Sequence, residues 1–145
     1  MDALVRPLPF ALPERIEPRL ETLRRFWSAI RRGENEIPFA DDLKIDQLSL
    51  FAPRLFTFDV RERPQRFRFD ICGTEIARRY GEELEDRFLD ELKETEPLEY
   101  LASQCCAAMQ SCAPAWFATE SYERLVLPMW GNGAISVLLG AFTWR

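Results

Sequence analysis

Apolar residues recur every three or four positions near the start of the chain, as on one face of an α-helix. The members of this stripe are Ile16, Leu20, Leu23, Phe26, Trp27 and Ile30. Arginines and glutamates occupy positions on the other face, and Gly33 supplies a helix stop. The spacing predicts an amphipathic N-terminal helix over residues 14–32.

The apolar stripe of this helix has two possible uses. It packs on the chain's own domain, or it forms a dimerisation surface with a second copy of the chain. Both uses are compatible if the stripe is wide. The residues that would form the dimer interface are Leu23, Phe26, Trp27 and Ile30.

Two strands are predicted farther along, at residues 55–60 and 66–71, joined by a turn that contains Pro64. In the second strand, polar residues alternate with Phe67, Phe69 and Ile71, which is the period of a half-buried strand. We therefore expect these three apolar side chains to face the core together.

Helical signals fill the middle of the chain. Thr74 is suited to cap a short helix that runs through Tyr80 and ends at Gly81. Pro97 suits the first turn of a longer helix that runs to about Cys112.

The last third of the chain is strand-like. Residues 115–122 and 124–128 are predicted strands, and Asn132-Gly133 indicates a two-residue hairpin turn of type I′. Residues 134–144 form a long strand that is apolar on both faces, which is typical of a central strand covered on both sides. The pattern therefore predicts an α+β domain with this strand near the centre of the sheet.

The order of these elements, two strands, short helices, a longer helix and three strands, resembles that of a PAS domain. The strings that carry the resemblance are Leu55-Phe56-Thr57-Phe58-Asp59-Val60, Phe67-Arg68-Phe69, Gly73-Thr74-Glu75-Ile76, Tyr80-Gly81 and Leu125-Val126-Leu127-Pro128-Met129 before Gly131-Asn132-Gly133, with Trp27 in the first helix. They are similar to a largely alphaproteobacterial subgroup of small, single-domain PAS proteins. Over residues 16–144, the resemblance implies a five-stranded antiparallel sheet with helices on one face and the N-terminal amphipathic helix outside.

Composition limits the partners and the location of the protein. The 145 residues, 47% of them hydrophobic, fit an extended proline-rich arm at 1–13 and a single domain over 14–145. A net charge of −5 and a pI of about 4.9 disfavour binding to nucleic acid. We expect no signal peptide, no membrane span and a cytoplasmic protein.

The absence of histidine narrows the chemistry. It excludes a His-ligated haem and a Ser-His-Asp triad within one chain. The Asn-Cys-Arg-Phe-Leu-Gln string of flavin-photoreceptor PAS domains is also missing, so the cofactor is unknown. Cys105, Met109 and Cys112 would share a helix face as a redox or soft-metal site, but core packing is the favoured interpretation, and we predict no metal site.

The PAS resemblance implies sensing of small molecules, light or redox state, or dimerisation. The residues that could line a pocket between sheet and helices are Phe67, Phe69, Tyr80, Met109, Trp116 and Tyr122. We expect a stand-alone sensory or signal-transduction domain without its own output domain. It would act as a homodimer and bind a small apolar ligand, a signalling protein partner, or both.

The alternative is a purely structural dimerisation and interaction module with a packed core. An enzyme is not expected. Asp70 and Tyr80 would be the acid–base pair to nominate, and nothing beyond their residue types supports them.

Overall fold

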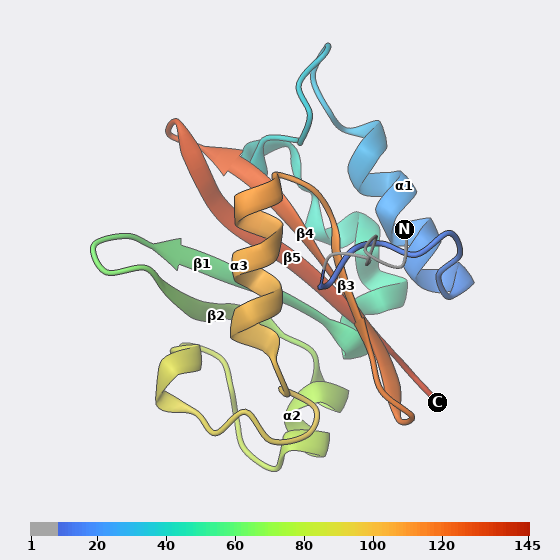
Figure 1. Ribbon diagram of the computed structural model, residues 1–145, viewed down its shortest axis with the longest axis vertical. Helices are drawn as coiled ribbons and strands as arrows, with labels where there is room; N and C mark the ends of the chain where they lie inside the picture. Colours follow the sequence, from blue (N-terminus) through green and yellow to red (C-terminus); the bar gives the residue numbers. More distant parts are fainter. Residues whose placement is uncertain (1–8) are drawn as a thin grey trace, which may run out of the picture.

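The computed structural model describes residues 9–145, so the first eight residues of the predicted arm lie outside the described residues. Five antiparallel strands form one sheet in the order β2-β1-β5-β4-β3 (Figure 1). The strands are β1 Leu55–Arg61, β2 Arg66–Cys72, β3 Ala115–Ala118, β4 Tyr122–Gly131 and β5 Ala134–Trp144. The predicted α+β class with a five-stranded antiparallel sheet is confirmed.

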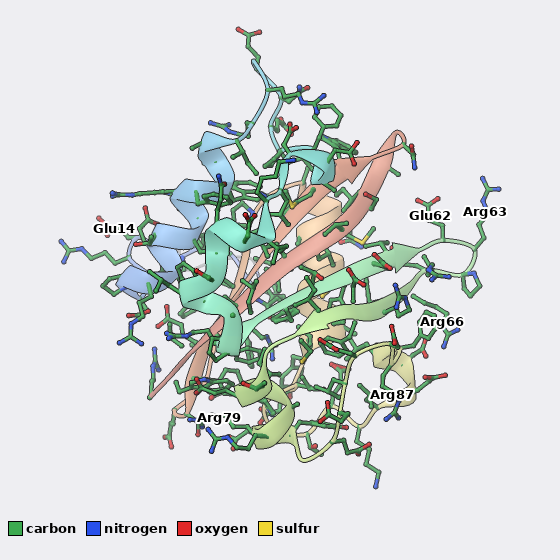
Figure 2. All side chains as sticks on the ribbon, turned by 180° about the vertical axis from the view of Figure 1, so that it is seen from behind. Glu14, Glu62, Arg63, Arg66, Arg79 and Arg87 are labelled. Carbon is green, nitrogen blue, oxygen red and sulfur yellow. The ribbon has the colours of Figure 1, made fainter. Side chains whose placement is uncertain are left out.

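Helices cover both faces of this sheet. They are α1 Pro18–Ala29, η2 Ala40–Asp42, η3 Ile45–Arg54, α2 Thr74–Tyr80, η4 Leu89–Glu91 and α3 Leu101–Ser111. The face under α3 is called the inner face here (Figure 1), and the opposite face, over which α1 and η3 lie (Figure 2), is the outer face. Among the described residues, no helix is both long enough and apolar enough to cross a lipid bilayer.

The last strand lies where its apolar pattern predicted. β5 is the middle strand, paired with β1 on one side and β4 on the other. The hairpin turn between β4 and β5 is confirmed, with positive φ at both central residues, 53° at Asn132 and 80° at Gly133. β5 is therefore covered on both faces and hydrogen-bonded on both edges, which explains why it has so few polar residues.

β4 is longer than the strand predicted over 124–128. It does not end at Pro128 but continues through this residue. The edge strand β3 pairs only with Glu123–Val126 and ends before the proline. Farther along the same side of β4, the amide of Trp130 donates to the carbonyl of Pro38 (2.8 Å). The missing amide of Pro128 thus falls on the side that β3 no longer occupies, and the proline interrupts no ladder hydrogen bond.

Ile71 does not share a face with Phe67 and Phe69, as the alternation predicted. A register shift in the β1–β2 pairing places Phe69 opposite Phe58 but Ile71 opposite Thr57. The extra residue of this bulge moves Ile71 to the outer face, because successive side chains point to opposite sides of a strand.

The two helix starts in the middle of the chain also differ from the sequence predictions. Gly73, not Thr74, is the N-cap of α2, and it lies so close to the carbonyl of Pro53 that any Cβ there would collide with it. α3 begins at Leu101 and not near Pro97, because Tyr100 has a left-handed φ of 57°. The carbonyls of Pro97 and Glu99, which a longer helix would have used internally, accept hydrogen bonds from Arg124.

Candidate functional site

The six predicted pocket residues do not form one pocket. Phe67, Phe69 and Tyr122 are buried on the inner face. Trp116 lies on the outer face, because its neighbour Phe117 contacts Arg124, which bonds to α3. Strand alternation thus separates Trp116 from the residues that it was expected to join.

Tyr80 and Met109 do not complete an inner pocket. Met109 is half-buried on α3. Tyr80 donates its hydroxyl to the carbonyl of Lys93 (2.8 Å), and the carboxylate of Asp70 lies 3.7 Å from the guanidinium of Arg68. The Asp70–Tyr80 pair is therefore engaged with other groups.

A row of aromatic rings fills the inner face between these positions. Consecutive ring centroids along the row lie 4.4–6.1 Å apart. Its members, in order, are Phe67, Phe58, Phe69, Phe56, Phe142 and Tyr122. Rings at such spacing attract one another, and this attraction stabilises the fold in addition to the burial of their apolar surface.

Arg124 of β4 lies at the end of this row and is fully buried. Its Nε donates to Gln104 Oε1 of α3 (2.6 Å), and its two terminal nitrogens donate to the carbonyls of Pro97 (2.8 Å) and Glu99 (2.6 Å). The guanidinium carbon also lies 4.8 Å from the ring centre of Phe117. One side chain thus attaches α3, and the segment before it, to the sheet.

This buried cation has no carboxylate partner among the described residues. Burial lowers the pKa of Arg124, but a guanidinium with an ordinary pKa of about 12 or more stays protonated at neutral pH. Neutral oxygens and ring faces therefore stabilise the charge. Sequence reasoning missed Arg124, because a single Arg in a strand pattern does not indicate burial.

Tyr122 and Glu99 extend the same cluster. The Tyr122 hydroxyl donates to Glu99 Oε1 (2.6 Å). Burial, together with this hydrogen bond, raises the pKa of Tyr122 above its ordinary value of 10. Tyr122 is accordingly a neutral hydrogen-bond donor near pH 7.

An apolar groove of about 600 Å³ lies on the edge strand β3. The amide of Trp116 donates to the carbonyl of Phe10 (2.9 Å), which holds the start of the described chain against this edge. Tyr100, on the rim, leaves 63% of its surface exposed. The lining residues are Pro9, Phe10, Ala11, Leu12, Pro13, Tyr100, Trp116, Phe117 and Ala118.

Glu123 lies on the outer side of the same region, where its side chain is buried and only 5% exposed. Its carboxylate accepts from the amide of Glu17 (2.9 Å) and from Trp116 Nε1 (2.8 Å), and it pairs with Arg145 (2.9 Å). Glu17 is the N-cap of α1. One carboxylate thus joins the start of α1, strand β3 and the last residue of the chain.

Acidic pH should remove the contribution of Glu123 to stability. Burial opposes its ionisation, but the bonds from Glu17, Trp116 and Arg145 hold its pKa below the ordinary 4.5. A lowered folded-state pKa stabilises the fold above the unfolded pKa, and this stabilisation is lost as pH falls through the folded value. We expect Glu123→Gln to be less stable than wild type at about pH 6, and the difference to shrink towards about pH 3.

Urea unfolding of both proteins across this pH range measures the effect. A stability difference that stays constant from about pH 6 to about pH 3 would show that the ionised carboxylate is not what stabilises this region.

The dimer-interface prediction divides into two pairs. Leu23 and Trp27 are buried against the sheet of their own chain, and Trp27 Nε1 donates to the carbonyl of Pro128 (3.0 Å). Phe26 and Ile30 pack on the core but stay partly exposed. Of the four candidates, these last two are thus the ones that a second copy could reach without opening the fold.

Cys105 is a core residue, and the other three cysteines are partly buried against the core. All four are free thiols. Burial raises the pKa of the Cys105 thiol above its ordinary 9.0, and burial with nearby glutamates raises that of Cys72 to about 12. Thiols with raised pKa values are poor nucleophiles at neutral pH, which agrees with the packing interpretation.

No protein-family model matches this chain, and no curated protein matches it.

Proposed function

We propose that the chain is a PAS-like sensory domain that receives its signal as a small apolar ligand or a protein partner, and that it has no catalytic activity. The arrangement of the chain supports this proposal. Two strands, then α2, η4 and α3, then three strands form the antiparallel sheet, with α3 on the inner face and α1 outside. The PAS resemblance implies this order of elements, whereas η3 lies with α1 on the outer face.

The groove on β3 is the proposed place of binding. Ligand pockets are mostly apolar and measure about 300–1,000 Å³, and the groove has a volume of about 600 Å³. Trp116, Phe117 and Tyr100 offer ring surface to a ligand. The inner face supports this choice, because Arg124 and the aromatic row already fill the space there.

A structural interaction module with a packed core is the second candidate. The filled inner face favours it, since Phe69, Tyr122 and Arg124 are all fully buried. In this version, a homodimer would form through two partly exposed residues, Phe26 of α1 and Ile30, the C-cap of α1.

Native mass spectrometry of the protein isolated from its own host tests the first candidate. We expect the wild-type protein to retain a small molecule and Ala118→Phe to lose it, because the phenyl ring of the variant enters the groove from β3. Ala118→Ser is the matched control and should keep the ligand, since its side chain stays small. A molecule retained equally by both variants would place the binding site elsewhere.

The same spectra test the second candidate. A ligand-free dimer that separates on Phe26→Ala or Ile30→Ala substitution would favour the structural module. A ligand-free monomer that captures no partner would count against both candidates.

A further inference from the structure

Two charged residues that are adjacent in β4 are buried on opposite faces of the sheet. Glu123 is 5% exposed and Arg124 is 0% exposed. Successive side chains of a strand point to opposite sides, so Glu123 faces outward and Arg124 inward. One peptide unit therefore connects the two most polar buried clusters described above.

Each of these residues is an anchor for a separate helical layer. On the outer face, Glu123 accepts from the amide of Glu17, where α1 begins (2.9 Å). On the inner face, Arg124 donates to Gln104 of α3 (2.6 Å). It also donates to the carbonyls of Pro97 and Glu99, in the segment that leads into α3.

We infer that the Glu123–Arg124 unit of β4 couples the two layers, so that disturbing the bonds of Arg124 to α3 and residues 97–100 loosens the start of α1, and the reverse. The backbone of β4 is paired with β3 and β5 at both residues, which leaves few ways for it to adjust. Buried polar networks have few satisfied arrangements, so Arg124 and Glu123 keep their hydrogen bonds together only while the peptide unit that they share keeps its position.

Amide hydrogen exchange of the full chain, followed by NMR, tests the coupling. Gln104→Ala removes one acceptor of the Arg124 side chain, and with it the donor to the carbonyls of Ala115 and Arg124, while the sequence of β4 stays unchanged. We expect it to speed exchange of the Glu17 amide about two- to thirtyfold, the range that coupled sites commonly show. The matched control is Ala108→Gly, which weakens α3 at another buried position and should leave the Glu17 amide unchanged.

The reverse experiment uses the outer anchor. Trp116→Phe removes the indole donor to Glu123 and keeps an aromatic ring in place. Because coupling between two sites is reciprocal, exchange should accelerate at the amides of Leu101 and Gln104.

Two results would overturn the inference. Each substitution could act only within its own layer, which would show that the layers are independent. Alternatively, Ala108→Gly could affect Glu17 as strongly as Gln104→Ala does, which would show that the effect follows the stability of α3 and not Arg124.

Discussion

Replacement of Arg124 by alanine is expected to lower the free energy of unfolding by about 3 kcal/mol or more, because three buried acceptors lose their donor at about 1 to 3 kcal/mol each. The substitution leaves Gln104 Oε1 and the carbonyls of Pro97 and Glu99 without their donor. It also leaves a cavity beside the rings of Phe117 and Tyr122. Single domains are stable by about 5 to 15 kcal/mol, so the loss is a large share.

Urea unfolding followed by circular dichroism measures this loss. Arg124→Met is the matched control, because it refills most of the volume with an apolar chain and still leaves the oxygens unpaired. Each unpaired buried acceptor costs about 1 to 3 kcal/mol, so Arg124→Met should also be destabilised. If Arg124→Met were as stable as wild type, the hydrogen bonds of Arg124 would contribute nothing net to stability.

Trp27→Ala is expected to lower the free energy of unfolding by a similar amount, about 3 to 5 kcal/mol, as for other buried Trp residues. Trp27 is 4% exposed and closes α1 onto the outer face of the sheet. Its indole also supplies the hydrogen bond to the carbonyl of Pro128 (3.0 Å). The substitution removes both the packing and this bond.

Phe26→Ala is the control on the same helix, since the side chain of Phe26 is only partly buried. It should be destabilised much less than Trp27→Ala in the same unfolding assay. Equal losses of unfolding free energy would mean that the burial of Trp27 against the sheet contributes no more to stability than the partly exposed Phe26 does. If Trp27→Ala also abolished an oligomer, this result could be interpreted only together with the stability measurement, because the substitution weakens the fold itself.

Local patterns were sufficient for the existence of the five strands and for the central position of β5, but not for the bounds of β3 and β4. A strand that is apolar on both faces must be covered on both faces, and Asn132-Gly133 allows the positive φ values that a tight hairpin needs. The alternation in β2 correctly identified Phe67 and Phe69 as core residues. It placed Ile71 wrongly, because a bulge depends on the pairing partner and leaves no mark in the strand itself.

The candidate site was predicted less well than the fold, for a reason that Arg124 illustrates. Arg is rarely buried without a charged partner, so the strand pattern did not predict that Arg124 would be buried. Its burial depends on three oxygens that come from α3 and the segment before it, 20 to 27 residues earlier in the chain. The same contacts shortened the helix that was predicted to begin near Pro97.

The sequence alone thus determined the class of the fold, the hairpin and the buried strands, because these follow from side-chain periodicity and turn geometry between near neighbours. Only the tertiary structure decided which face each polar residue of β3 and β4 meets. It separated Trp116 from Tyr122 and placed Glu123 under α1 and Arg124 under α3. Such contacts join residues far apart in the chain, and the free energy that selects them comes from burying charge with its partners together.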